Sequence, residues 1–176
     1  MTLWAVLERF QTVLVGFFGF AGIIFTLWYN ARVARQLRRD ERDHERATLH
    51  AALTAELRIN HESLNSNLAK LREDPAAEGG GAYIPTERMD DAYRVFTDKI
   101  GLLSENEVYR VMAAYLRLRT YYAQLFLVGL PLEASDSHVN VPAGNFEILA
   151  AMIQASINPV DEAIHALERA RGADGS

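Results

Sequence analysis

The hydrophobic pattern near the start of the chain is an unbroken apolar run. Residues 10–29 contain no charged side chain, and charged residues bound the run on both sides. Twenty residues of α-helix rise about 30 Å, which matches the hydrocarbon thickness of a bilayer. Aromatic side chains suited to the membrane interface stand near its ends: Trp4, Trp28 and Tyr29. We predict a transmembrane helix over 10–29 after a short extracytoplasmic segment, 1–9.

Two other interpretations of this run are weaker. A cleaved signal peptide has a basic start and small residues at its cleavage site, whereas Leu27, Trp28 and Tyr29 are bulky. A buried core helix would need apolar partners on every side, and the remaining segments are too few to surround it.

Basic residues concentrate directly after the apolar run, in a segment 30–48 that we call the basic stalk. Residues 30–46 hold six Arg against four Asp and Glu, whereas residues 47–176 hold 11 basic and 18 acidic residues. The positive-inside rule then places the N-terminus outside and the rest of the chain in the cytoplasm. Sixteen of the 18 basic residues are Arg, which is typical of GC-rich bacterial genomes, so we expect a bacterial inner membrane. The arginines that set this topology can also bind anionic lipid headgroups: Arg32, Arg35, Arg38, Arg39 and Arg42.

One face of the predicted membrane helix carries small residues. At 100° per residue, a glycine and threonine stripe shares this face: Thr12, Gly16, Gly19, Gly22 and Thr26. Small residues allow another helix backbone to approach closely in lipid. This face is therefore a candidate helix–helix contact.

Apolar residues return at helical spacing beyond the stalk: Leu49, Leu53, Leu57, Leu64, Leu68 and Leu71. The stretch 30–74 contains no proline or glycine, so the membrane helix is expected to continue into a long cytoplasmic helix. Further helices are predicted after Thr86 to Ile100, from the Ser104 capping box to about 128, and over 143–171, where Pro159 should kink or split the helix. Loops are predicted over 73–82 and 129–145, and no stretch alternates long enough to predict a sheet. The predicted fold class is all-α, an antiparallel four-helix bundle over 49–171 with a disordered tail, 172–176.

The later helices also have predicted inner faces. That of the second helix consists of Met89, Tyr93, Phe96 and Ile100. The stripe of the third helix is Val108, Val111, Tyr115, Leu118, Tyr122 and Leu125. The stripe of the fourth helix is Phe146, Leu149, Ile153, Ile157, Val160, Ile164 and Leu167.

Other positions in these helices carry their own predictions. Met112, Leu116 and Phe126 widen the apolar stripe of the third helix, which predicts a central place in the bundle. Its tyrosines are expected in the core with hydroxyls at the rim: Tyr109, Tyr115, Tyr121 and Tyr122. Asn60 falls within the apolar stripe of the first helix, where it could fix register with a partner, be a satisfied core residue, or face solvent.

Candidate chemistry is sparse. The chain has no cysteine, which excludes disulfides, thiolate metal sites and cysteine nucleophiles, and its charge of −5 argues against nucleic-acid binding. Two Glu-x-x-His pairs have the spacing of di-iron bundles, but both lie in charged helices, so they are weak metal candidates: Glu41, His44, Glu162 and His165. No nucleotide, phosphate or nucleophile-elbow motif occurs, and we predict no cofactor.

The sequence therefore predicts a non-enzymatic, single-pass membrane protein. Its helical domain would act as a subunit or adaptor in a membrane-associated complex, with the bilayer and either a protein partner or a homo-oligomer as its contacts. The first alternative is an oligomerising membrane effector or pore former. The second is a metal-dependent helical-bundle enzyme.

Overall fold

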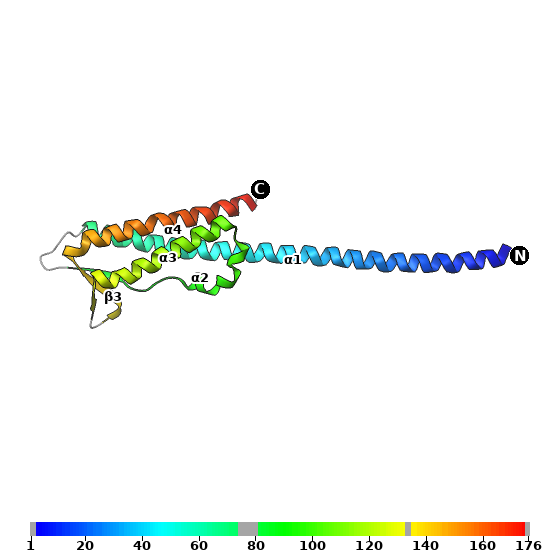
Figure 1. The fold of residues 1–176 in the computed structure, drawn as a ribbon, viewed down its shortest axis with the longest axis horizontal. Helices are drawn as coiled ribbons and strands as arrows, with labels where there is room; N and C mark the ends of the chain where they lie inside the picture. The colour runs from blue at the N-terminus through cyan, green and yellow to red at the C-terminus, as the bar shows by residue number, and fades with distance from the viewer. Residues whose placement is uncertain (1–2, 74–80, 133–134, 175–176) are drawn as a thin grey trace. The chain divides into compact units, whose positions relative to one another are not determined.

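The described part of the chain is predominantly helical, which confirms the predicted all-α class. The computed structural model describes residues 3–73, 81–132 and 135–174. Its elements follow in the order α1 (Leu3–Glu73), β1 (Gly81–Pro85), α2 (Asp91–Val95), η1 (Thr97–Leu102), α3 (Glu105–Val128), β2 (Leu130–Leu132), β3 (Ser135–Pro142), η2 (Ala143–Asn145) and α4 (Phe146–Asp174), where η is a 3-10 helix (Figure 1).

The chain divides into two units, Met1–His44 and Glu45–Ser176. The first unit consists of the N-terminal part of α1. Every residue from Phe17 to His44 is exposed, including large apolar side chains such as Phe18 at 67% and Phe25 at 65%. By length and composition, α1 contains a stretch apolar enough to cross a membrane, and none of that stretch is buried.

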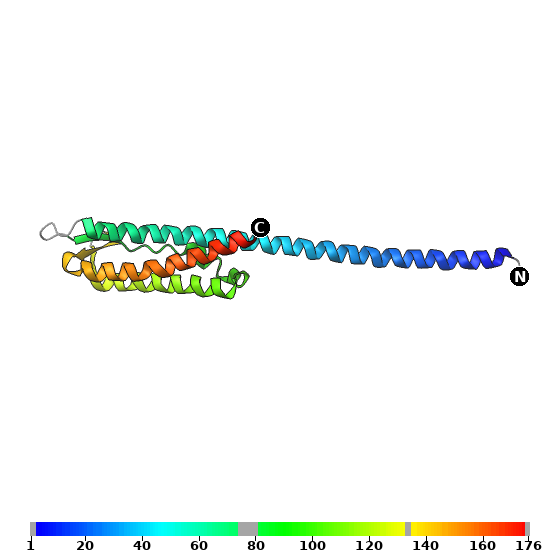
Figure 2. The same ribbon diagram turned by 90° about the horizontal axis from the view of Figure 1, so that it is seen from above.

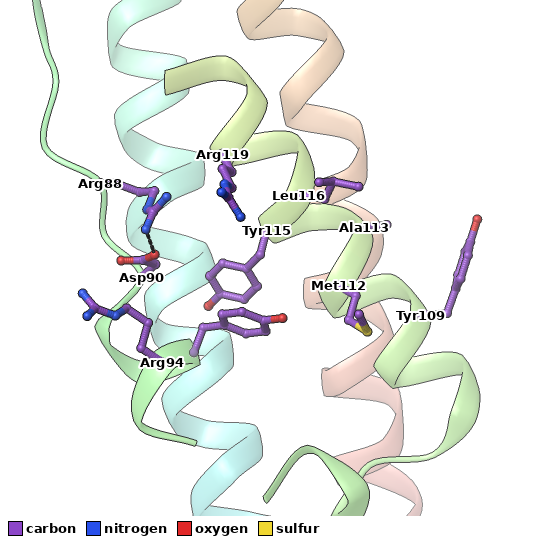
Figure 3. A pocket seen from close by; sticks show the side chains of 10 residues that line it. Arg88, Asp90, Arg94, Tyr109, Met112, Ala113, Tyr115, Leu116 and Arg119 are labelled. Atoms are coloured by element: carbon purple, nitrogen blue, oxygen red, sulfur yellow. Dashed lines mark ion pairs between the residues drawn. The ribbon is translucent and has the colours of Figure 1, made fainter. Parts of the chain in front are cut away.

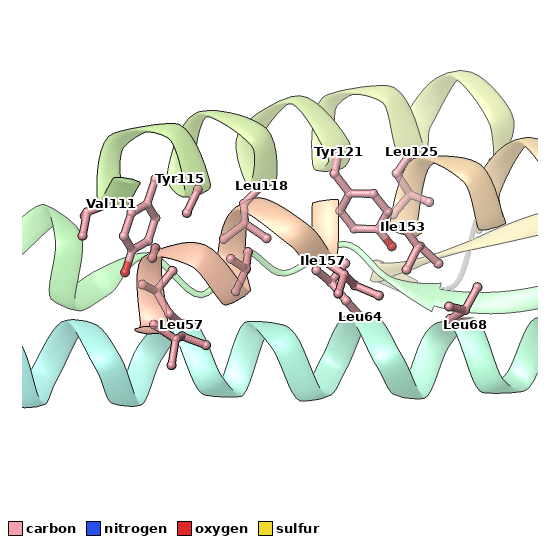
Figure 4. Packing of buried hydrophobic residues seen from close by; sticks show 14 of the residues in the cluster. Leu57, Leu64, Leu68, Val111, Tyr115, Leu118, Tyr121, Leu125, Ile153 and Ile157 are labelled. Carbon is pink, nitrogen blue, oxygen red and sulfur yellow. The ribbon is translucent and has the colours of Figure 1, made fainter. Parts of the chain in front are cut away.

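The second unit packs the C-terminal part of α1 with α3 and α4. Figure 2 shows α3 and α4 running in opposite directions, and α1 in this unit runs the same way as α3. The predicted apolar stripes of all three helices meet in one buried cluster (Figure 4). All six leucines predicted for the stripe of α1 are buried: Leu49, Leu53, Leu57, Leu64, Leu68 and Leu71.

The predicted four-helix bundle is not confirmed, because most of its second helix is replaced. The segment expected to be helical from Thr86 to Ile100 contains only the five-residue α2 and the start of η1, after an irregular stretch 86–90. Tyr93, Phe96 and Ile100 still pack against the core as predicted, but Met89 is 44% exposed. We call residues 86–95 the crossing segment. It occupies one side of the core without the hydrogen bonds of a continuous helix.

The prediction that the chain has no sheet is wrong. The chain forms a three-stranded antiparallel sheet of order β1-β3-β2, in which β2 and β3 lie within the second predicted loop and β1 begins at the end of the first. In its register Ile84 pairs with Val139, and both side chains are buried, as is Val141. The alternation in β3 is carried by Val139 and Val141 alone, which is too short to stand out in the sequence.

The predicted capping box of α3 is confirmed. The prediction that α3 occupies the centre of the bundle is wrong. The Ser104 side chain accepts a hydrogen bond from the Glu107 backbone N–H, the Glu107 carboxylate accepts one from the Ser104 N–H, and Gly129 ends the helix. Val111, Leu118 and Leu125 are buried, whereas Met112, Leu116 and Phe126 are 52%, 66% and 53% exposed. Thus α3 has one buried face and a second apolar face that the described chain does not cover.

The fourth helix also differs from its prediction. Pro159 lies inside α4 without dividing it, and α4 begins at Phe146 after the short η2. Leu149, Ile153 and Leu167 are fully buried, in agreement with the predicted stripe.

The junction between α3 and the sheet should not tolerate a larger residue at Gly129. An added Cβ there would lie 2.8 Å from Val139 Cγ2 and 3.1 Å from the Leu125 carbonyl oxygen, and neither neighbour is the end of a flexible side chain. We expect Gly129→Ala to lower the free energy of unfolding by about 1–3 kcal/mol. Urea denaturation measures this change. The matched control is Gly144→Ala, whose Cβ would meet nothing within 4 Å, and equal losses in the two variants would contradict the steric argument.

Candidate functional site

A buried carboxylate on α1 positions the crossing segment. Glu56 is 8% exposed. Its two carboxylate oxygens accept hydrogen bonds from the backbone N–H of Ala92 at 2.5 Å and of Tyr93 at 3.2 Å. A helix start leaves such N–H groups without partners inside the helix. Glu56 therefore acts as a cap supplied by another element.

Three further contacts complete this arrangement. The Tyr115 hydroxyl on α3 donates to Glu56 Oε1 at 2.5 Å. The Tyr115 ring stacks on Tyr93, with ring centres 4.1 Å apart and planes inclined by 22°. One turn further along α1, Asn60 Nδ2 donates to the Met89 carbonyl at 2.8 Å. Together these contacts fix the crossing segment against both α1 and α3.

A groove of about 670 Å³ lies between the crossing segment and α3 (Figure 3). Tyr93 on the crossing segment and Tyr115 on α3 also line the groove, and their rings stack on each other. The remaining side chains line the two walls: Arg88, Asp90 and Arg94 on the crossing segment, and Tyr109, Met112, Ala113, Leu116 and Arg119 on α3. This volume is within the range of small-molecule sites.

The groove carries a net positive charge in an acidic domain. Its lining has three arginines and one acid, and that acid is engaged, since Arg88 Nη2 lies 2.5 Å from Asp90 Oδ2. Neither Arg94 nor Arg119 forms an ion pair among the residues that the structure describes. Chemically, the groove offers guanidinium donors beside aromatic and aliphatic surface.

Buried tyrosines in this domain resist ionisation. Burial raises the pKa of Tyr115 well above its ordinary value, and the hydrogen bond to the Glu56 carboxylate raises it further. Burial likewise raises the pKa of Tyr121 and of Tyr122. Tyr115 is therefore a neutral hydrogen-bond donor at physiological pH.

A second buried polar cluster secures the start of α3. Glu107, 2% exposed, accepts a hydrogen bond from the Ser104 N–H at 2.6 Å. His50 Nε2 lies 3.0 Å from Glu107 Oε1, and Arg46 Nη2 lies 3.6 Å from Oε2. The capping box is thereby tied to α1, which gives this cluster a structural function.

The structure does not join the weak metal candidates into a site. Glu162 pairs with Arg110, and His165 lies 3.9 Å from Glu168. Glu41 and His44 belong to the first unit, where both are exposed. Within residues 3–73, 81–132 and 135–174, no three His, Asp or Glu side chains are grouped so that they could hold a metal ion.

The candidate residues of the membrane helix lie on α1. Cβ atoms added at Gly19 and Gly22 would meet nothing within 4 Å, and Thr26 Oγ1 donates to the Gly22 carbonyl at 2.8 Å. Trp28 and Tyr29 are exposed, and the Arg32 guanidinium lies 5.6 Å from the Trp28 ring centre. The other predicted headgroup arginines are also exposed: Arg35, Arg38, Arg39 and Arg42. The side chains of Thr12 and Trp4 lie outside the described set, as does any side-chain contact at Gly16.

The structure decides between the interpretations of Asn60, and it shows that the prediction of a buried Tyr109 is wrong. Asn60 is 1% exposed, and its Nδ2 donates to the carbonyls of Glu56 and Met89, so it is a core residue. Its buried Oδ1 accepts no hydrogen bond from the described residues. Tyr115 and Tyr121 are buried as predicted, but their hydroxyls are not at the rim: that of Tyr115 bonds to buried Glu56, and that of Tyr121 is itself buried. Tyr109 is 67% exposed at the groove.

Sequence reasoning missed the groove and its anchor. Glu56 falls in the stripe of buried leucines on α1, as Asn60 does. A buried polar contact could have been predicted from this position. The groove arginines gave no signal, because the groove forms from segments that are separate in sequence. Comparisons with protein-family models, curated proteins and solved structures found no match to this chain.

Replacing the Glu56 carboxylate should loosen the crossing segment. In Glu56→Gln the side chain keeps its shape but loses the charge that strengthens its hydrogen bonds, so we expect a loss of about 1–3 kcal/mol in unfolding free energy. Hydrogen exchange at the Ala92 and Tyr93 amides should accelerate in the same variant. Glu62→Gln, at an exposed position of α1, is the control. If exchange at these amides stays slow in Glu56→Gln, Glu56 does not hold the segment.

The raised tyrosine pKa values also predict a loss of stability in alkali. Unfolded tyrosine ionises near pH 10, while buried Tyr115 stays protonated, so raising the pH above about 10 favours the unfolded chain. This contribution is fully present below pH 10 and falls by up to about 1.4 kcal/mol per pH unit. Denaturation between pH 9 and 11 should give a shallower decline for Tyr115→Phe than for the unaltered chain. Parallel declines would show that Tyr115 does not contribute.

Proposed function

We propose that this chain is a single-pass membrane protein whose helical domain serves as a non-enzymatic subunit or adaptor of a membrane-associated complex. The observation that carries the proposal is the exposed apolar stretch of α1. From Phe17 to Tyr29 every residue is exposed and none is charged. Such a surface is unfavourable in water, and a bilayer would bury it.

The charge distribution supports a defined orientation. Five arginines directly after the apolar stretch are exposed: Arg32, Arg35, Arg38, Arg39 and Arg42. Under the positive-inside rule they place the helical domain in the cytoplasm of a bacterial cell, with the N-terminus outside the inner membrane. The glycine and threonine face is the proposed contact with a second membrane helix.

The absence of cysteine from the chain allows a direct test of this topology. Thr2→Cys should react with a membrane-impermeant maleimide in intact spheroplasts, and Asn106→Cys only after lysis. The full chain should also stay with the membranes through an alkaline carbonate wash. Recovery in the soluble fraction would overturn the membrane assignment, and the reverse labelling pattern would overturn the orientation.

The proposed helix–helix contact predicts that a leucine has different effects on crosslinking when it is introduced on two opposite faces of the membrane helix. Gly19→Leu should abolish the discrete species obtained by formaldehyde crosslinking in native membranes, because the added side chain separates the backbones. Ala21→Leu, about 200° around the helix, should leave that species intact. The chain itself has room for the leucine, since nothing lies within 4 Å of a Cβ at Gly19. A monomer with no crosslinked partner in any variant would contradict an assembly function.

A further inference from the structure

The outer face of α3 carries an apolar surface that the described chain leaves open. Tyr109, Met112 and Leu116 follow at spacings of three and four residues and are 67%, 52% and 66% exposed. A contiguous apolar patch of this kind marks a binding surface more often than scattered apolar residues do. Here the patch forms one wall of the groove.

The stacked tyrosine pair at the groove is held in place before any ligand binds. The Tyr115 ring stacks on Tyr93, and the Tyr115 hydroxyl is anchored on Glu56. Glu56 also fixes the backbone of the crossing segment at Ala92 and Tyr93. A preformed surface of this kind loses little conformational entropy on binding, which favours affinity.

The charges at the groove favour a negatively charged ligand. Arg94 and Arg119 stand on opposite walls, and neither is neutralised by an ion pair among the described residues. Residues 47–176 carry a net charge of −7, from 11 basic and 18 acidic residues. A ligand anion is therefore attracted to this groove against the acidic background, and a cation is not.

From these observations we propose that the groove binds an amphiphilic anion, with a carboxylate or phosphate on Arg94 or Arg119 and an apolar chain on Met112, Leu116 and the tyrosine rings. A small hydrophilic anion would leave the apolar wall unused, and a neutral chain would leave the guanidiniums unused. The same chemistry is found in a free acyl anion and in an anionic membrane lipid. This site goes beyond the proposed subunit function and does not depend on it.

The four methionines of the chain provide a local readout. The full chain, with 13C-labelled methionine methyl groups, is placed in phosphatidylcholine nanodiscs and titrated with decanoate or decyl phosphate. The Met112 signal, assigned with Met112→Leu, should shift and saturate. The Met152 signal, from a partly buried residue of the core, should not move. Decanol and decyltrimethylammonium are the neutral and cationic controls with the same chain length.

The arginine contribution is tested by a charge-matched pair of variants. The double variant Arg94→Gln/Arg119→Gln should raise the apparent Kd for decanoate about tenfold or more. Arg72→Gln/Arg169→Gln, which removes two exposed arginines outside the groove lining, should leave it unchanged. An unmoved Met152 signal in the groove variant shows that the domain has kept its fold.

The outcomes distinguish a lipid headgroup from a diffusible anion as the ligand, and they show when the proposal is wrong. A Met112 shift on replacing part of the phosphatidylcholine by phosphatidylglycerol identifies a lipid headgroup as the anion. A shift with decanoate alone identifies a diffusible acyl anion. The proposal is overturned if Met112 does not shift with any anion, if decanol shifts it equally, or if the groove variant binds as well as the unaltered chain. A shift that depends on protein concentration without a probe would also overturn it, because a second copy would then occupy the groove.

Discussion

A carboxylate buried among leucines loses its hydration, at a cost on the order of several kcal/mol, unless hydrogen bonds replace the water. Glu56 meets this requirement with partners from two other elements, the α2 backbone and the Tyr115 hydroxyl. The position of the crossing segment, the stacked tyrosines and the groove beside them all follow from that requirement. Removing the Glu56 carboxylate would also leave the N–H groups of α2 unpaired. The stability of α2 and that of the Glu56 contacts are therefore linked.

The long helices could be predicted because each has a clear apolar periodicity in its own segment of the sequence. The stripes of α1, α3 and α4 repeat over several turns, and the turns that bury Leu53, Leu118 and Ile153 meet in the core. The Ser104 capping box marks the start of α3 within one residue. These features are local, so a single sequence is sufficient to show them.

The remaining features depend on contacts between distant segments. The sheet is assembled from short strands whose pairing, such as Ile84 with Val139, cannot be read from either strand alone. The crossing segment has helical periodicity, but its backbone donates to Glu56 and accepts from Asn60 in a different conformation. The outer face of α3 was assigned to the core for the same reason, since periodicity shows that a face is apolar but does not show what covers it.

The crossing segment has a consequence for how this domain could diversify. Its irregular stretch 86–90 is held through backbone atoms, by bonds from Asn60 to Met89 and from Thr86 to the Ser137 carbonyl. The Arg88 and Arg94 side chains are exposed, and Arg88 pairs with Asp90, so neither packs in the core. Substitutions at such positions would alter the charge and shape of one groove wall while the three long helices stay intact. Homologous chains could then share this scaffold and yet differ in what the groove accepts.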